Sequence, residues 1–304
     1  MTRSIIQKDF KRNRYIYLMA LPVLAYYLLF HYQPMYGAII AFKDFTPAKG
    51  ILGSPWVGLK HFHTFFTGPY AFRLIRNTFL ISFYELIFGF PAPLLLAILL
   101  NEVLATRYKR VIQTLSYLPH FISLVVICAL IKNFTASTGL VNDIIAFFFG
   151  EKARSTLLQD PSNFRTVYVV SGIWQGVGWG SIIYLAAISK IDQQLYEAAI
   201  IDGAGRFARM MHVTLPGILP TIIIMLILRM GSLMSVGFEK VFLLYNTGIY
   251  ETADVISTYV YRRGIIDTDW SFSAAVGLFN SVVNFVLVVA ANFISGKVSE
   301  TSLW

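Results

Sequence analysis

The residues best able to do chemistry in this chain are polar side chains that interrupt its apolar stretches. Glu85 and Arg229 lie inside two such stretches, and Tyr84 precedes the glutamate. Asn280 and Asn284 are four residues apart, so they share one face of a helix. Ionisable groups in apolar surroundings are costly and usually face a partner or a wet cavity. We therefore expect these five side chains to meet partners or to line a polar path.

Two interpretations of the charged residues remain open. In the first, which we favour, Glu85 and Arg229 form an ion pair between two helices. In the second, Arg229 binds a hydroxyl or carboxylate of a solute, because the planar guanidinium matches a carboxylate. The aromatic faces of Tyr84 and Trp174 would then contact a ring of that solute. For the asparagine pair, hydrogen bonds between helices and contact with a solute are equally compatible with the sequence.

The side-chain sets needed for catalysis or metal binding are missing from the sequence. His61 and His63 have no carboxylate at ligand spacing, and we expect them in an exposed loop without a metal. The single cysteine, Cys128, excludes an intrachain disulfide. No G-x-x-x-x-G-K-[ST] motif occurs, so the chain itself is expected to bind no nucleotide and no other cofactor.

The composition indicates a membrane protein. Of 304 residues, 56% are hydrophobic and 13% are charged, and the mean hydropathy is +0.63. Ordinary soluble domains carry about 25% charged residues. The net charge of +9 is attributed to basic residues that flank membrane spans, not to nucleic-acid binding.

Six segments have the length and apolarity of membrane helices, which need about 20 residues to cross the bilayer. They are residues 15–33, 77–100, 111–131, 167–188, 214–236 and 271–294. The first is predicted to be a retained helix, because no small-x-small cleavage site follows it. From these boundaries, Glu85 lies about 12 Å and Arg229 about 10 Å below one membrane face. Asn280 and Asn284 lie about 14 and 20 Å below it.

The distribution of basic residues predicts the orientation. Residues 1–14, 101–110, 189–213 and 295–304 form one set of loops, and the longer intervening loops form the other. Both sets hold twelve Lys and Arg, so the basic density of the shorter set is about double. Both termini are therefore predicted to be cytoplasmic.

Helix-breaking residues occur inside several spans. Pro91 and Pro93 are expected to kink the second span, and Pro119 the third. The fourth span carries glycines at four-residue spacing from Gly172 to Gly180. We favour helix packing over solute passage as the role of this small-residue stripe.

The loop at about 189–213 is the most informative stretch. It is expected to form a short helix, a break and a second short helix. Asp192 is suited to cap the first helix, and Gly203 to the left-handed position that ends it. Pro216 is expected to open the following span.

This loop resembles the EAA motif of binding-protein-dependent ABC importer permeases, which have a MetI-like transmembrane domain. The pattern is E-A-A, two residues, D-G-A, then a fixed interval to a hydrophobic-x-L-P ending. The matching residues are Glu197, Ala198, Ala199, Asp202, Gly203, Ala204, Leu215 and Pro216. Met210 departs from the pattern, because many members have phenylalanine there.

The resemblance implies an all-α, six-helix permease fold of the type I importer class. It implies that the loop docks on a separate subunit that binds ATP and magnesium. The other expected partners are a second permease subunit of a different chain, a second ATP-binding subunit and an extracellular solute-binding lipoprotein. Residues 1–14 would form a cytoplasmic segment, and residues 15–304 the permease domain.

Further segments are similar to the polysaccharide-uptake branch of this family, often called LplB-like. They are PMYGAIIAFKDF at 34–45, WVGL at 56–59, SYLPHFIS at 116–123, GFEKVFLLYN at 237–246 and ADVISTYVYR at 253–262. This resemblance implies ATP-driven import of oligosaccharides by alternating access across a bacterial cell membrane. The alternatives are an ion-gradient-coupled secondary transporter and a membrane-bound enzyme.

Overall fold

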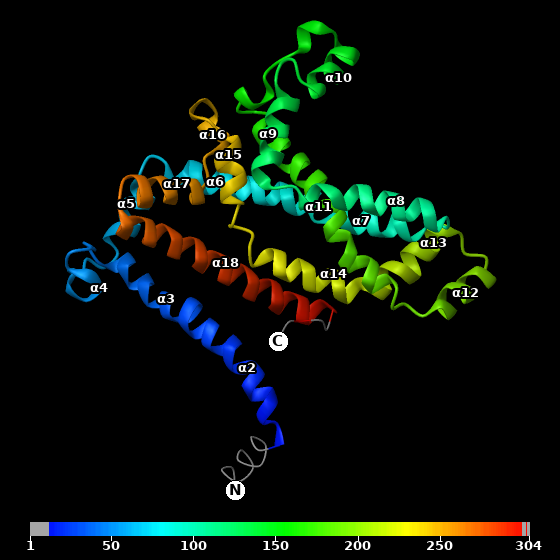
Figure 1. The fold of residues 1–304 in the computed structure, drawn as a ribbon, viewed down its shortest axis with the longest axis horizontal. Coiled ribbons are helices and arrows are strands. Elements are labelled where there is room, and N and C mark those ends of the chain that lie inside the picture. The colour runs from blue at the N-terminus through cyan, green and yellow to red at the C-terminus, as the bar shows by residue number, and fades with distance from the viewer. Residues whose placement is uncertain (1–11, 300–301, 303–304) are drawn as a thin grey trace. The chain divides into compact units, whose positions relative to one another are not determined.

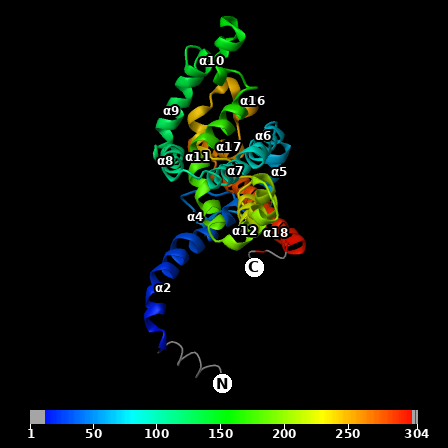
Figure 2. The same ribbon diagram turned by 90° about the vertical axis from the view of Figure 1, so that its right-hand side faces the viewer.

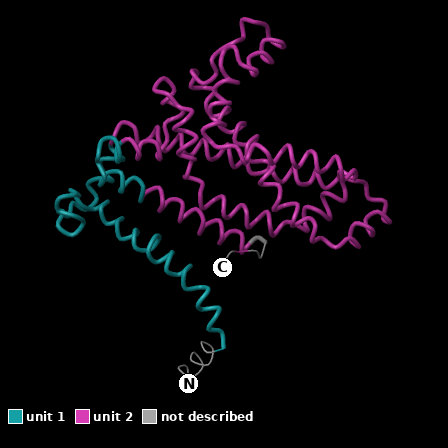
Figure 3. Tube along the Cα trace, in the orientation of Figure 1, with its two compact units in different colours: residues 1–67, 263–278 teal, residues 68–262, 279–304 magenta. Residues whose placement is uncertain are grey.

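A computed structural model describes residues 12–299 and residue 302. All regular elements in these residues are helical, and an isolated bridge joins Lys43 to Trp56. The chain divides into two compact units, residues 1–67 with 263–278 and residues 68–262 with 279–304 (Figure 3).

The first unit contains one long helical segment and several short helices. They are α2 (Arg14–Tyr27), η1 (Leu28–Tyr32), α3 (Gln33–Met35), η2 (Tyr36–Phe42), α4 (Gly50–Gly53), α5 (Lys60–Thr67), most of η9 (Arg262–Ile266) and the start of α18 (Trp270–Ser299). Nearly all apolar side chains of α2 are exposed. An apolar surface of this length requires lipid or another protein to cover it.

His61 corrects one prediction in this unit. It does not lie in an exposed loop but in α5, where it is buried together with Phe65 one turn away. Its Nε2 lies 3.1 Å from the carbonyl oxygen of Lys43. His63 lies on the exposed side of the same helix, as expected.

The second unit holds the remaining helices. They are α6 (Ala71–Tyr84), η3 (Glu85–Gly89), α7 (Pro91–Asn101), α8 (Thr106–Tyr117), η4 (Leu118–Phe121), α9 (Leu124–Thr135), α10 (Leu140–Phe149), η5 (Glu151–Ala153), η6 (Leu157–Gln159), α11 (Phe164–Ile188), α12 (Gln193–Ile201), α13 (Arg206–Arg209), η7 (Met210–Thr214), α14 (Leu215–Met230), α15 (Phe238–Leu244), η8 (Thr247–Ile249), α16 (Tyr250–Ala253), α17 (Ile256–Tyr261) and the rest of α18.

Helix α11 is the central element of the second unit. It packs against α7 and α8 along much of its length, as both views show (Figures 1 and 2). One apolar core surrounds its first turns and includes Phe164, Tyr168 and Val241. A second core surrounds its last turns and includes Tyr184, Ile188 and Ile218. Helix α11 therefore connects two separately packed ends of the unit.

Six segments are long and apolar enough to cross a membrane, which confirms the number predicted. They are Arg14–Phe42, Ala71–Asn101, Leu124–Phe149, Phe164–Ile188, Arg206–Met230 and Trp270–Lys297. Several boundaries differ from the prediction: the first segment runs on to Phe42, the second begins at Ala71, and the third lies at Leu124–Phe149. The expected third span at 111–131 is broken, because its first half belongs to the amphipathic helix α8 and the chain is extended at Ile122.

The fifth span begins and ends earlier than predicted. Helix α13 continues through the π-helical turn η7 into α14, so the helical segment starts at Arg206 and ends at Met230. Residues beyond Met230 form turns, and the buried side chain of Asn284 binds their backbone. Arg229 therefore lies in the last helical turn, and the depth measured from Val236 was based on a wrong helix end.

Pro91 and Pro119 lie where the helix type changes. Pro91 opens α7 directly after the π-helical turn η3, so the second span is α-helical, then π-helical, then α-helical. Pro119 lies in the 3-10 turn η4, after which the helix stops. A proline has no N–H for the preceding turn and its ring contacts the carbonyl there, which explains both changes.

The glycines of α11 have two different roles. A Cβ atom on Gly180 would lie 2.9 Å from Pro93, so the packing prediction is confirmed there. Gly178 is packed more closely still, because its Cβ would lie 2.1 Å from the carbonyl oxygen of Ser116 in α8. A Cβ on Gly176 would meet nothing within 4 Å, so for Gly176 the packing prediction is wrong.

Replacing Gly178 with alanine is expected to destabilise the protein by about 1–3 kcal/mol, because the added methyl group forces α8 and α11 apart. A thermal unfolding scan of the purified protein would measure this loss. Gly176→Ala is the matched control on the same helix and should leave the midpoint near that of the unsubstituted protein. Equal effects of the two substitutions would contradict the packing assignment.

Candidate functional site

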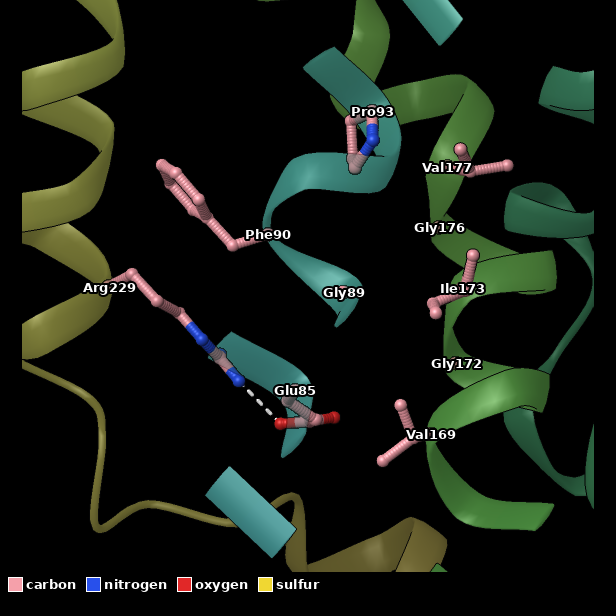
Figure 4. Close-up of a pocket in the computed structure, with 10 residues that line it drawn as sticks. All are labelled: Glu85, Gly89, Phe90, Pro93, Val169, Gly172, Ile173, Gly176, Val177 and Arg229. Atoms are coloured by element: carbon pink, nitrogen blue, oxygen red, sulfur yellow. Dashed lines mark hydrogen bonds and ion pairs between the residues drawn. The ribbon is translucent and has the colours of Figure 1, made fainter. Parts of the chain in front are cut away.

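A cavity of about 260 Å³ lies between η3 and α11, with Arg229 of α14 at its side. Figure 4 shows Arg229 extending toward Glu85, while Gly172 and Gly176 lie on the opposite wall. Arg229 donates a hydrogen bond to a carboxylate oxygen of Glu85. The structure thus contains the ion pair favoured from the sequence. The charge of Arg229 is already matched by a carboxylate in this cavity.

Lys240 of α15 lies beside Gly172, one of the residues that line this cavity. Its Nζ donates to the carbonyl oxygen of Tyr168 at 2.8 Å and lies 4.6 Å from the centre of that tyrosine ring. A Cβ on Gly172 would come within 3.2 Å of this nitrogen. Burial lowers the pKa of Lys240 to about 8, although the charge of Glu85 opposes this shift.

A second cavity of about 390 Å³ lies one helical turn nearer the start of α11. It is lined by Tyr84 and Phe88 on one side and by Arg165 and neighbouring residues of α11 on the other. The two cavities share Val169 and Ile173. Together they follow one stretch of α11, from its second residue to Val177.

The other polar candidates have separate positions. Asn284 accepts a hydrogen bond from the backbone N–H of Met234 at 2.8 Å and donates to Ser235 at 2.9 Å, so it binds the turn after α14. The Oδ1 atom of Asn280 is buried and has no hydrogen-bond partner among the described residues. Trp174 is about half exposed and lines neither cavity. The structure therefore pairs Glu85 with Arg229 in the first cavity, whereas Tyr84 lines the second cavity and Trp174 lines neither.

A buried carboxylate near the start of α11 is absent from the candidates predicted from sequence. Asp254 has no exposed surface, and both of its oxygens accept hydrogen bonds from Arg262 at 2.7 Å. Thr258 donates to it at 2.9 Å, and Arg73 of α6 lies 3.4 Å away. The ring of Tyr250 lies 4.7 Å from the guanidinium carbon of Arg262.

Asn77 of α6 connects this carboxylate's loop to α11. Its amide nitrogen donates to the carbonyl oxygens of Glu251 and Asp254, at 2.9 and 3.0 Å. Its amide oxygen accepts a hydrogen bond from Arg165 at 2.9 Å. An acidic residue within the apolar run from Ala253 to Ile256 was the available sequence signal. Thr258 and Arg262 follow it within eight residues, but Arg73 is 181 residues away and could not be identified from spacing.

The loop after α11 has the predicted helix–break–helix form at its start. The side chain of Asp192 caps α12 by accepting a hydrogen bond from the backbone of Gln194 at 2.9 Å. Gly203 has a φ angle of +78°, which confirms the left-handed position expected after the helix. Tyr196 and Thr214 share a hydrogen bond of 2.9 Å that joins α12 to the fifth span. Pro216 lies in the first turn of α14, although the helix continues into it from η7.

The residues that match the EAA pattern lie on this loop and at the start of α14. Glu197, Ala198, Asp202 and Gly203 are exposed, whereas Ala199, Ala204 and Leu215 are partly buried. Large apolar side chains are exposed beside them: Leu195, Ile200, Ile201 and Phe207. A loop with exposed apolar residues is suited to contact another protein.

Replacing Arg229 with leucine is expected to lower the amount of folded protein in the membrane, because Glu85 loses its charged hydrogen bond. Such a bond contributes about 1.5–3 kcal/mol. The charge reversal Glu85→Arg with Arg229→Glu should restore part of the loss, and Arg107→Leu on an exposed surface is the control. Quantitative blotting of membranes checks this. Normal amounts of an inactive R229L protein would instead indicate that Arg229 binds solute.

The lowered pKa of Lys240 predicts a pH dependence of stability. The unfolded chain holds this proton up to about pH 10.4, whereas the folded protein releases it near pH 8. The unfolded state therefore binds more protons between these values, and stability rises with pH across them. Unfolding midpoints of the protein and of K240M should diverge over this interval. The same rise in K240M would contradict the assignment, and K132M, at an exposed lysine, is the control.

Comparison with known proteins agrees with these features. Residues 89–300 match the family described as binding-protein-dependent transport system inner membrane component. Protein LplB of Bacillus subtilis is 48% identical over 97% of this chain and 92% of its own length. The polygalacturonan/rhamnogalacturonan transport system permease protein YteP of the same organism is 46% identical over 96% of this chain and 91% of its own length.

Solved structures agree with the fold. A chain of a bacterial ABC transporter involved in the import of the acidic polysaccharide alginate has a TM-score of 0.88 and 43% identity. The match covers 97% of this chain and 99% of that chain. A second structure, of the alginate transporter with a periplasmic protein that carries an alginate pentasaccharide, has a TM-score of 0.89 and 42% identity.

The six apolar helices, the loop between α11 and α14 and the extent of these matches lead to one conclusion. This chain is a multi-pass membrane transport subunit, not an enzyme, and it belongs to the binding-protein-dependent transport system inner membrane component family of ABC permeases.

Proposed function

We propose that this chain is the permease subunit of an ATP-driven importer of oligosaccharides derived from complex polysaccharides. The observation that carries the proposal is the capped loop after α11, whose apolar side chains Leu195, Ile201 and Phe207 are exposed. The chain has no phosphate-binding motif of its own. An exposed apolar loop on such a chain fits a docking contact with a separate ATPase.

The names of the relatives support the class of solute. YteP is named for polygalacturonan and rhamnogalacturonan transport, and the two solved structures concern alginate. A further relative, 26% identical, is named for arabinooligosaccharides. All of these are carbohydrates of several units. The paired cavities along α11 provide space for sugar units between helices.

The complete importer in this proposal contains further chains. A second, different permease subunit encloses the path together with this one, and two subunits that bind ATP and magnesium dock on the loops. A solute-binding lipoprotein delivers the sugar, consistent with the family description and with the periplasmic protein in the alginate transporter. The denser basic loops support a cytoplasmic position of both termini in the bacterial cell membrane.

Helix α11 supplies the mechanical connection in this mechanism. One end of it contributes Arg165 and Val169 to the cavities, and the other leads directly into α12. Closure of the ATPases would move α12, and the helices would switch between outward-facing and inward-facing arrangements. The permease contributes different contacts to the solute in each state.

The proposal predicts vanadate-sensitive ATP hydrolysis by the purified complex, stimulated by the binding protein together with an oligosaccharide. Uptake into proteoliposomes should require ATP on the side of the membrane that the loop after α11 faces. Uptake that follows a proton gradient without ATP would support a secondary transporter, and turnover of the sugar by this chain alone would support an enzyme. Either result would contradict the proposal.

The loop itself is tested by Glu197→Arg in the same preparation. A reversed charge at the centre of the docking surface should remove the ATPase subunits during purification and reduce ATP hydrolysis at least tenfold. Glu102→Arg, in another loop of the set predicted to be cytoplasmic, is the matched control. Normal retention of the ATPases by E197R would argue against α12 as the docking element.

A further inference from the structure

We propose that the cavity beside Arg165 is a binding subsite for an acidic sugar unit, with Arg165 as the group that holds its carboxylate. This inference rests on the proposed import of oligosaccharides and specifies where the charge of the solute is recognised. The cavity is lined by Tyr84, Phe88, Arg165 and the α11 residues Val169, Val170 and Ile173, with Thr166 at its edge.

Arg165 has donors available for a ligand. Its Nη2 donates to the amide oxygen of Asn77, and this neutral group is its only hydrogen-bond partner among the described residues. Its Nε is buried and has no partner. Since unpaired buried donors are costly, a ligand oxygen at this guanidinium would remove an existing penalty.

The surrounding charges leave this end of the unit positive. Arg73 and Arg262 are neutralised only in part, because they share the single carboxylate of Asp254. Arg76 lies near Arg165 and contacts the backbone oxygen of Glu251 at 3.4 Å. The carboxylate of Glu251 is the acidic group that acts on Arg165 from a distance, and it forms no ion pair with it.

The neighbouring cavity provides a contrast within the same protein. There the guanidinium of Arg229 is already paired with Glu85, so its positive charge is not available to a carboxylate of the solute. A Cβ atom on Gly176 in the wall of this cavity would meet nothing within 4 Å, and glycine has no side chain to hold a carboxylate. Charge recognition is therefore assigned to Arg165 and not to Arg229.

The remaining walls suit a sugar ring. The rings of Tyr84 and Phe88 are 6.5 Å apart and face the cavity together with apolar residues of α11. A volume of about 390 Å³ lies within the range of ordinary small-molecule sites. The apolar face of a pyranose ring can pack on such walls while its carboxylate meets the planar guanidinium of Arg165.

The test measures binding to the assembled importer in lipid nanodiscs, without the solute-binding protein. Trigalacturonate and its carboxyl-reduced neutral counterpart are titrated by calorimetry. The unsubstituted complex should bind the acidic sugar at least tenfold more tightly than the neutral one. Arg165→Gln should abolish this preference, while Arg165→Lys should keep a weaker preference because lysine lacks the planar pair of donors. Arg107→Gln, at an exposed arginine that does not line the cavity, is the control and should keep the full preference.

Three results would overturn the subsite: an unchanged preference in R165Q, an equal loss of affinity for both sugars, or the same loss in R107Q. If R165Q does not assemble, an unchanged preference in R165K overturns it as well. If the unsubstituted complex shows no preference for the acidic sugar over the neutral one, the subsite is overturned as well. These outcomes are independent of ATP-dependent uptake, so the subsite can fail while the importer function stands.

Discussion

The completely buried carboxylate of Asp254 is the constraint on which one end of the second unit depends. A charge without exposed surface must be matched, and removal of a partner from such a group costs about 3–5 kcal/mol. Arg262, Thr258 and Arg73 supply the compensation, and they come from three different positions in the chain. The same loop binds Asn77, which in turn orients Arg165 on α11. Arg165, the arginine assigned to solute recognition, is thus held in place by the loop whose contacts balance the buried charge of Asp254.

Along α11 the roles change from one end to the other. The first turns carry Arg165 and border the larger cavity, and the next turns open at Gly176 beside the Glu85–Arg229 pair. Further along, Gly178 and Gly180 are packed too closely against neighbouring helices for any side chain. The helix then leads to the exposed loop that is suited to another subunit. The open glycine, Gly176, therefore lies on the part of α11 that borders the proposed solute path. The closely packed glycines, Gly178 and Gly180, lie on the part that leads to the loop.

Sequence patterns predicted the features that depend on neighbouring residues. Apolar runs predicted six spans, and local chemistry predicted the cap at Asp192 and the left-handed Gly203. The predicted end of the fifth span was wrong because Asn284 accepts a long-range hydrogen bond from the backbone N–H of Met234, which stabilises the turn there. The ion pair was one of two interpretations, whereas the contacts of Asp254 were not foreseen. Partners up to 181 residues away satisfy that carboxylate, and no periodicity encodes such a distance.

The proposed solute path runs along the face of α11 between Arg165 and Gly176. A cryo-electron microscopy structure of the assembled importer with a bound acidic oligosaccharide tests it most directly. We expect sugar density in both cavities beside α11, with a carboxylate at the guanidinium of Arg165 and a ring against Tyr84 and Phe88. Density along another helix face, with both cavities filled by side chains or lipid, would contradict it.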